Sequence, residues 1–327
     1  MPLPARERHG GFLFVRGGAM GDFLLTLPAL RLARRSFPGQ SIEVLGTPGI
    51  VALATYFELA DAVRRLEDPA LARFFVHGAS LDPDWCAYFS SFSVVVSYLF
   101  DPDGIFHENL KRAGVRTLIR GPHRPAESGE RAAEQLAAPL ASLALFLEPG
   151  EAGQPLVSRD SAAIRNLIAL HPGSGSPRKN WGLENWACTA DRLHAETGAT
   201  MIVVAGEAEF SVIDEFCHQL QAAAVPFSLA NGLPLRDLAR RLAPCRLFLG
   251  HDTGPAHLAA ACGVPCTLAF GPTDPAVWAP AGSHVHILRA PGGSLAAIGP
   301  QEVWAVARAA LAPLEPPDQS NRTHGNQ

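Results

Sequence analysis

The sequence predicts an α/β protein built from two lobes with parallel sheets that face one another across a cleft. Three observations support this. Short apolar strands alternate with amphipathic helices in both halves, a segment rich in proline, glycine and charge separates the halves, and each half has a glycine turn between a strand and a helix. Alternating strands and helices are typical of parallel sheets, which bind ligands at the carboxyl ends of their strands. At 327 residues, the chain is also long enough for two cores.

The N-terminal half begins with an apolar strand expected at residues 11–15. A helix should follow over 22–36 and end near Pro38 and Gly39, because neither residue continues a helix well. Further strands are expected at 41–45, 92–99 and 115–119. The stretch 55–92 matches no recognisable pattern.

The C-terminal half repeats the alternation after a linker expected at residues 148–163. Its strands are expected at 167–170, 200–205, 227–229, 246–249 and 265–270, and its helices at 183–197, 209–224 and 235–242. From Pro313 the chain is polar and rich in proline and asparagine, which is typical of a disordered tail. We therefore expect domains at 1–150 and 151–312 and a tail at 313–327.

Composition and charge exclude several classes of function. The formal net charge is −4 and no basic stripe dominates, so nucleic acid is not an expected partner. The six cysteines have no zinc-site spacing, which favours reduced cytosolic thiols. Residues 1–10 lack the apolar core of a signal peptide, and the longest apolar stretch, 136–147, is too short to span a bilayer. We expect a cytoplasmic protein that at most rests on the inner face of the cytoplasmic membrane.

The first glycine turn runs from Arg16 to Asp22 and opens an apolar helix. A helix N-terminus after a tight turn offers free backbone N–H groups and the positive end of the helix dipole, which suit an anion. Asp22 can cap this helix, or it can act as a general base toward a substrate hydroxyl. The turn lacks the Gly-x-Gly-x-x-Gly order, and no acid ends the second strand, so an NAD site is disfavoured.

A second loop, residues 171–181, lies between a strand and a helix. Its glycines and serines allow close approach of the backbone to a ligand, and Arg178 and Lys179 can neutralise a diphosphate. The order of a Walker A loop is absent, which argues against nucleotide triphosphatase chemistry. A solvated turn with two incidental cations is the alternative interpretation.

A third turn contains Asp252, Thr253 and Gly254 and again opens an apolar helix. Asp252 can cap that helix, whereas Thr253 and Gly254 offer a hydroxyl and N–H groups to an anion. His257 follows one turn later and can face the ligand or pack in the interior. Beyond the strand at 200–205, Glu209 can bind ribose hydroxyls, or it can reflect the usual acidic bias of helix N-termini.

Asp101 and Asp103, with Pro102 between them, have the letters of a metal-binding Asp-x-Asp motif. Acidic proline turns are common, and no other carboxylates cluster nearby in the sequence. A metal site is therefore disfavoured.

Taken together, these motifs resemble the heptosyltransferases of glycosyltransferase family 9. The matching stretches are Arg16-x-x-x-x-Gly21-Asp22 with Leu27-Pro28-Ala29-Leu30, His171-Pro172-Gly173 with Lys179-x-Trp181, and Asp252-Thr253-Gly254-Pro255-x-His257 with Phe270-Gly271-Pro272-Thr273-Asp274-Pro275. The resemblance covers most of residues 11–312. It implies a GT-B fold in which the N-terminal domain binds the acceptor and the C-terminal domain binds the nucleotide-sugar donor.

The resemblance also implies an inverting transferase that needs no metal or other cofactor and moves heptose from ADP-heptose to a glycan such as the lipopolysaccharide inner core. Asp22 would deprotonate the acceptor hydroxyl, and Lys179 would stabilise the departing diphosphate. The implied donor-binding residues are Ser174, Ser176, Glu209, Asp252, Thr253, Gly254 and His257. Among these, Glu209 would bind the ribose, and the role of His257 is open.

The acceptor is expected to be an anionic glycan or a lipid-linked acceptor, met at the inner membrane. Lys111, Arg112 and Arg120 are the candidates to bind it. An amphipathic helix followed by a solvated strand edge explains these cations equally well. We expect a monomer. The rival interpretations are a GT-B transferase with another donor or acceptor, a non-catalytic sugar-nucleotide-binding relative, a nucleotide-sugar epimerase and an NAD-linked oxidoreductase.

Overall fold

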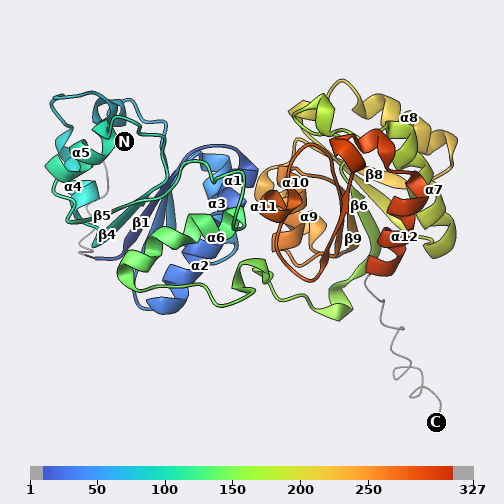
Figure 1. Cartoon of the computed structure of the whole chain (residues 1–327), viewed down its shortest axis with the longest axis horizontal. Coiled ribbons are helices and arrows are strands. Elements are labelled where there is room, and N and C mark those ends of the chain that lie inside the picture. The colour runs from blue at the N-terminus through green and yellow to red at the C-terminus, as the bar shows by residue number, and fades with distance from the viewer. Residues whose placement is uncertain (1–9, 312–327) are drawn as a thin grey trace, which may run out of the picture.

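The structure, a computed structural model, describes residues 10–311 and contains two parallel β-sheets, each covered by helices (Figure 1). The first sheet has the order β3-β2-β1-β4-β5, formed by Ala62–Arg65, Ile42–Gly46, Phe12–Arg16, Val94–Ser97 and Thr117–Arg120. The second has the order β11-β10-β9-β6-β7-β8, formed by Val285–Arg289, Cys266–Phe270, Cys245–His251, Arg165–Leu170, Thr200–Ala205 and Phe227–Asn231. All neighbouring strands are parallel, which confirms the predicted fold class.

The helices connect the strands and cover the faces of both sheets. Those of the first lobe are α1 (Met20–Leu24), α2 (Leu27–Ser36), α3 (Pro48–Tyr56), α4 (Pro83–Ser90), α5 (Ile105–Arg112) and α6 (Ala132–Ala137). Those of the second are α7 (Leu183–Thr197), α8 (Ile213–Ala222), α9 (Leu235–Leu242), α10 (Gly254–Ala261), α11 (Pro275–Trp278) and α12 (Pro300–Ala310). Within residues 10–311, none of them has the length and apolar character needed to cross a bilayer.

Each central strand is apolar throughout because both of its faces are buried. In β1, Phe14 belongs to the cluster that includes α2, whereas Leu13 and Val15 belong to the cluster that includes α4 and α5. This alternation follows from the two-residue period of a strand, and continuous apolar runs are typical of strands in parallel sheets. The carboxyl ends of the strands, where the glycine turns lie, therefore remain as the polar edges of the lobes.

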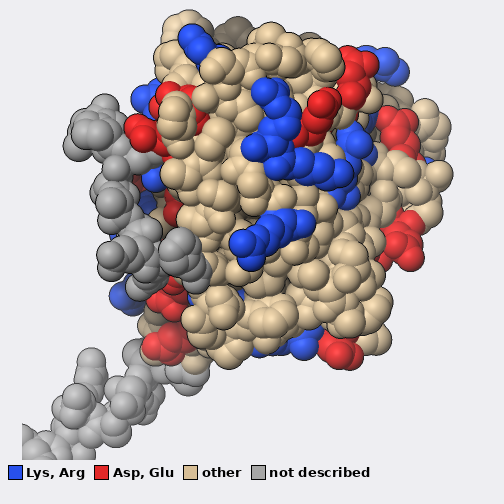
Figure 2. All heavy atoms as spheres, turned by 90° about the vertical axis from the view of Figure 1, so that its left-hand side faces the viewer, with Lys and Arg blue, Asp and Glu red and all other residues tan. Residues whose placement is uncertain are grey.

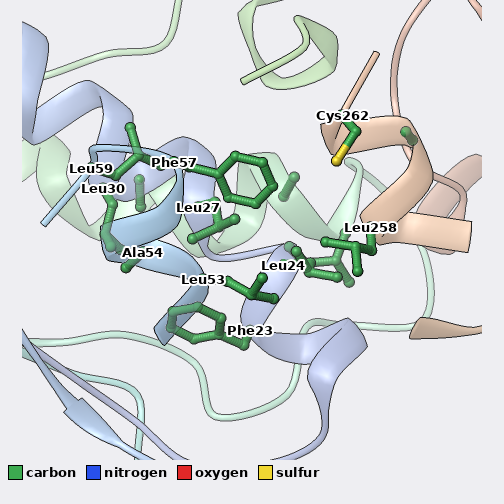
Figure 3. Close-up of a cluster of buried hydrophobic side chains, with 14 of the residues drawn as sticks. Phe23, Leu24, Leu27, Leu30, Leu53, Ala54, Phe57, Leu59, Leu258 and Cys262 are labelled. Carbon is green, nitrogen blue, oxygen red and sulfur yellow. The ribbon is translucent and has the colours of Figure 1, made fainter. Parts of the chain in front are cut away.

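The two lobes share one apolar cluster (Figure 3). Leu24 and Leu53 of the first lobe lie near Leu258 of α10 and Cys262, which directly follows this helix, and Leu24, Leu53 and Leu258 are almost fully buried. Arg236 of α9 adds polar contacts to α3, where it donates to the carbonyl of residue 52 at 3.1 Å and to the hydroxyl of residue 55. The lobes are thus joined by a buried seam as well as by the chain between them.

The connecting segment 148–163 bonds to the first lobe through residues 148–154 and to the second through residues 156–159, where the N–H of Leu156 donates to the carbonyl of Ala261 at 2.8 Å. Glu151 is buried, and its carboxylate accepts a hydrogen bond from Arg35 at 3.0 Å and from the N–H of Glu148 at 2.9 Å. Arg31 donates to the carbonyl of Glu151 and, at 3.0 Å, to that of Gln154. The predicted linker is therefore an ordered connection rather than a freely moving one.

Two predicted helices differ from those observed. The helix expected at 22–36 is divided into α1 and α2. Pro28 has no N–H to donate to the preceding turn, and the N–H of Thr26 donates to the carbonyl of Phe23 at 2.9 Å. The helix expected at 209–224 begins only at Ile213, and Glu209 ends a short 3₁₀ turn.

The stretch 55–92, which the sequence left unassigned, forms β3 and α4. The signal was weak because β3 is only four residues long and half-exposed. The tail predicted at 313–327 lies outside the described residues.

Candidate active site

A cleft of about 940 Å³ lies between the lobes at the carboxyl ends of their strands. It is lined on one side by the first glycine turn and on the other by the turn that opens α10. Six residues selected from the sequence line it: Asp22, Lys179, Asp252, Thr253, Gly254 and His257. The fold thus brings together two turns that are about 230 residues apart in the chain.

A second pocket of about 380 Å³ opens from the same place into the second lobe. It shares Lys179, Asp252, Thr253 and Gly254 with the cleft. Its other sequence-predicted residues are Ser174, Ser176 and Glu209, and its apolar wall contains Val204, Ala230, Leu233, Leu235 and Leu238. An apolar pocket with a polar and cationic mouth can hold a flat ring system that carries phosphates.

Asp22 lies in the first turn of α1, three residues after the N-cap position, which Ala19 occupies. Its Oδ2 accepts a hydrogen bond from the N–H of Ala19 at 3.3 Å. The expectation that Asp22 is the N-cap residue is therefore wrong, although its carboxylate still satisfies the helix end. Oδ1 has no hydrogen-bond partner among residues 10–311, so Asp22 presents a carboxylate oxygen at the cleft.

Arg16, at the end of β1, holds the turn that carries Asp22, and sequence reasoning did not assign it a role. Its buried guanidinium donates to the carbonyl of His123 at 2.7 Å and to those of Tyr98 and Asp22 at 3.4 Å. Burial lowers the pKa of Arg16, and the Asp22 charge opposes this effect. Arginine nevertheless stays protonated in proteins, so a fixed positive charge lies beside the turn. The sequence did contain a signal for this role, because Arg16 is a charged residue at the end of an otherwise apolar strand.

Lys179 and Asp252 form an ion pair in which Nζ lies 2.6 Å from Oδ2. The same oxygen accepts a hydrogen bond from the hydroxyl of Thr273 at 2.9 Å, and Oδ1 lies 3.9 Å from Nε2 of His257. Burial alone would raise the pKa of Asp252, but its contacts with His257 and Lys179 lower it to about 2. One interpretation of the sequence made Asp252 the cap of α10, and this is wrong. Thr253 is the N-cap residue, and the Asp252 carboxylate bonds to Lys179 instead.

His171 links Glu209 to the α10 turn. Its Nε2 lies 3.2 Å from Oε1 of Glu209, and its Nδ1 lies 3.2 Å from the hydroxyl of Thr253. Oε2 of Glu209 accepts a hydrogen bond from the N–H of Gly206 at 2.9 Å. Burial alone would raise the pKa of the Glu209 carboxyl, but His171 and the backbone donors hold it below its ordinary value. Glu209 is thus a buried, fixed anion at the wall of the smaller pocket.

Ser174 shapes the loop that follows β6. Its hydroxyl lies 2.7 Å from the carbonyl of Ser176 and 2.6 Å from Oδ1 of Asn180, and it accepts from the N–H of Ser176 at 3.2 Å. Arg178 is exposed, in contrast to half-buried Lys179. Of the two cations of this loop, Lys179 is the one that lines both pockets.

The cations proposed for the acceptor lie apart from Asp22. Lys111 and Arg112 are on α5 and do not line the cleft, and Arg112 donates to Oδ1 of Asn109 at 2.6 Å. Figure 2, which views this end of the first lobe, shows Lys and Arg surfaces interspersed with acidic ones. Arg120 lines a smaller neighbouring pocket of about 180 Å³. The N-terminal cations that do line the cleft are Arg16 and Arg124.

Asp101 has a structural role at the start of α5. Its two oxygens accept hydrogen bonds from the N–H groups of Phe106 at 3.1 Å and His107 at 3.0 Å. These bonds satisfy free donors of the helix N-terminus. Over the described part of the chain, no group of three or more His, Cys, Asp or Glu side chains is arranged to hold a metal ion.

Comparison with known proteins identifies relatives of this architecture. The model of glycosyltransferase family 9 (heptosyltransferase) matches residues 133–299. Lipopolysaccharide heptosyltransferase 1 of Pseudomonas aeruginosa is 26% identical over 301 residues, which cover 84% of this chain and 82% of that protein.

Solved structures of similar fold include ADP-heptose lipopolysaccharide heptosyltransferase II of Escherichia coli, with a TM-score of 0.72, 17% identity and coverage of 92% of this chain and 98% of that one. The E. coli heptosyltransferase WaaC with ADP-2-deoxy-2-fluoro heptose has a TM-score of 0.67, 19% identity and coverage of 91% and 99%. The match of the family model to half of the chain establishes that this protein is a glycosyltransferase and belongs to family 9, the heptosyltransferase family.

Proposed function

We propose that this protein is an inverting, metal-independent transferase that moves heptose from ADP-heptose to the lipopolysaccharide inner core. The observation that carries the proposal is the Lys179–Asp252 pair, because it lies where the smaller pocket opens into the cleft that contains Asp22. The relatives support the choice of substrates: one is a lipopolysaccharide heptosyltransferase, and another was solved with an ADP-heptose analogue.

The donor nucleotide is proposed to occupy the smaller pocket. Leu235, Leu238 and Val204 would pack against the base, and Glu209 would face the ribose. The diphosphate would then lie at the mouth, among Ser174, Ser176, Thr253 and Gly254. Lys179 has three N–H donors, of which the bond to Asp252 occupies one, so the ammonium group can still bind phosphate oxygens. In this arrangement Asp252 and His257 would lie near the donor sugar.

The reaction is proposed to be a direct displacement at the anomeric carbon. Asp22 would take the proton from the acceptor hydroxyl while that oxygen forms its bond to the anomeric carbon. The bond from this carbon to the diphosphate breaks on the opposite face, which inverts the configuration. Negative charge develops on the leaving group, so Lys179 and the N-terminal end of α10 would stabilise the transition state more than the ground state.

Metal independence is part of the proposal and rests on the charges near the leaving group. The Lys179 ammonium and the positive end of the α10 dipole supply the stabilisation that a divalent cation gives in other diphosphate sites. Their position at the shared mouth of the two pockets supports this assignment. A chelator should then have no effect on donor binding or turnover.

The acceptor is proposed to enter from the first lobe, so that residues 1–150 bind the acceptor and 151–312 bind the donor. Phe100, His123 and Arg124 line the cleft on that side. Acceptor contacts by Lys111, Arg112 and Arg120 stay a prediction, and the cleft geometry favours Arg124 over them. A monomer at the inner face of the cytoplasmic membrane would meet a lipid-linked acceptor there.

The first test is calorimetric titration with ADP, UDP, GDP and NAD, with and without EDTA, followed by a transfer assay with ADP-heptose and a heptose-free inner-core acceptor. Preferential binding of ADP that EDTA does not change, together with transfer to the acceptor, supports the proposal. Preference for UDP or GDP overturns the heptose donor, turnover of the donor without acceptor indicates an epimerase, and binding of NAD alone refutes the transferase mechanism.

A further inference from the structure

We infer that His251 is a positioning residue of the donor site, whose imidazole fixes both ends of the loop 173–181 so that this loop presents Lys179 to the donor diphosphate. The inference rests on the proposed function, since it assumes that a nucleoside diphosphate binds at this loop. His251 is the last residue of β9, directly before Asp252.

The imidazole bonds to the two ends of the loop. Nε2 accepts a hydrogen bond from the backbone N–H of Trp181 at 2.8 Å. Nδ1 lies 3.3 Å from the carbonyl oxygen of Gly173. Because the first bond needs a lone pair on Nε2 and the second needs a proton on Nδ1, the two partners select one neutral tautomer. The one imidazole ring therefore accepts a hydrogen bond from the end of the loop and donates one to its start.

Burial keeps this ring neutral. His251 is 0% exposed, and its ring packs edge-on against Trp186 with the centroids 5.2 Å apart. Burial, aided by His171, lowers the pKa of His251 to about 3, against the opposing effects of the Gly173 carbonyl and of the charges of Glu209 and Asp252. At neutral pH Nε2 thus remains available to accept from Trp181.

Two consecutive residues hold the whole loop. His251 binds its start and its end, and Asp252 binds Lys179 between them at 2.6 Å. The end of β9 therefore fixes the position of the loop backbone and also that of the Lys179 ammonium group. His251 lines neither the cleft nor the smaller pocket among the described residues, so any effect on the donor must pass through the loop.

Three substitutions separate the two hydrogen bonds. His251→Leu removes both of them, His251→Asn keeps a polar group at the reach of Nδ1, and His251→Gln keeps one at the reach of Nε2. His284→Leu is the matched control. His284 is a partly buried histidine of the same lobe that bonds to the carbonyl of Ala260 at 3.0 Å and lines neither the cleft nor the smaller pocket.

The affinity for ADP is the main readout, measured by calorimetry for each variant. We expect His251→Leu to weaken binding by about tenfold, with the Asn and Gln variants between it and the wild type and His284→Leu within about twofold of the wild type. In a Lys179→Ala background the effect of His251→Leu should shrink to about twofold or less, because residues that act through one contact are not additive. Amide hydrogen exchange at Trp181, which needs no nucleotide, should accelerate in His251→Leu and less in His251→Gln.

Each outcome is decisive. Equal ADP affinities for His251→Leu and His284→Leu overturn the inference, as does an undiminished effect in the Lys179→Ala background. If the Leu variant does not fold, the Asn and Gln variants carry the same test, and wild-type affinity in both overturns the inference. Wild-type protein that binds no nucleoside diphosphate refutes the proposed function and the donor role of His251 with it, whereas tight wild-type binding that no His251 variant alters refutes this inference alone.

Discussion

Lys179 and Asp252, 73 residues apart in the chain, meet at 2.6 Å and join the loop after β6 to the turn that opens α10. Both side chains are partly shielded from solvent, with exposed fractions of 29% and 12%. Thr273 donates to the same Asp252 oxygen, so the carboxylate is fixed from a third segment of the chain. The ammonium group is therefore oriented before any ligand arrives, which favours electrostatic stabilisation of a leaving diphosphate.

Replacing Lys179 by alanine should lower turnover by about 10²–10³-fold, because it removes a preorganised positive charge from the proposed leaving group. The control is Arg178→Ala, which removes the exposed neighbouring cation and should leave turnover within about twofold. Turnover is measured with saturating donor and acceptor, and circular dichroism checks that both variants fold. Normal turnover of the Lys179 variant would refute the assigned role.

Gly173 is expected to be essential for the wall of the nucleotide pocket. A Cβ at this position would lie 2.5 Å from Cγ and 2.7 Å from Oε1 of Glu209. Glu209 is buried and bonded to His171 and Gly206, so it has little freedom to move away. Gly173→Ala should therefore displace Glu209 and reduce ADP affinity by about tenfold.

Gly39 provides a control for that variant, because it lines neither the cleft nor the smaller pocket. A Cβ at Gly39 meets no atom within 4 Å, so Gly39→Ala should leave ADP affinity unchanged. Calorimetry on the two variants decides the matter. Equal affinities for both would show that the close approach of Gly173 to Glu209 has no bearing on the nucleotide.

The alternation of strands and helices predicted most of the fold, because continuous apolar strands and amphipathic helices are local signals. The helix Leu183–Thr197 and the strand Thr200–Ala205 have the predicted bounds. The division between α1 and α2 was missed although Pro28 was visible in the sequence: proline is favoured in the first turn of a helix, so Pro28 indicated the helix start observed at Leu27.

The site was predicted less completely because its contacts are long-range. Sequence motifs selected Lys179 and Asp252 separately, but no local pattern states that they pair. His251 and Arg16 were given no role because each acts through backbone partners, which the sequence does not identify. The positions of Lys111 and Arg112 away from the cleft likewise depend on how α5 packs, which the charge run does not encode.

Stability should fall in acid partly through His251. Its folded-state pKa of about 3 lies below the value of about 6.5 for an unfolded chain, so the unfolded state binds a proton that the folded state refuses. The resulting stability is present above pH 6.5 or so and is lost toward pH 3, at up to about 1.4 kcal/mol per pH unit. Below about pH 4, Asp252 adds to the loss, because its folded pKa is also depressed.

Urea unfolding of wild type and His251→Gln between pH 7.5 and about 4.5 isolates this contribution, since the remaining histidines are the same in both proteins. The free energy of unfolding of the wild type should fall more steeply with acid, so the difference between the two proteins narrows as the pH drops. A difference that stays constant over this range would show that His251 is not the neutral buried group described here.

Replacing Asp22 by asparagine should reduce turnover by about 10²–10⁴-fold, because an amide cannot take the acceptor proton. The amide oxygen can still accept from the N–H of Ala19, so α1 should keep its end and the protein its stability. ADP affinity should be unchanged, which separates this variant from those of the donor loop. Loss of ADP binding together with turnover would indicate a structural role instead.

The buried seam between the lobes should make them unfold together. Leu258 is 0% exposed on α10 and lies beside Leu24 of α1 in the cluster that both lobes share (Figure 3). Leu258→Ala leaves a cavity in this seam and should cost about 2–5 kcal/mol. Leu229→Ala, at a position 44% exposed on β8, is the control and should cost little. Scanning calorimetry should show one unfolding transition for the wild type, and its midpoint temperature should be lower in Leu258→Ala. Two separate transitions of the wild type would mean that the seam does not couple the lobes.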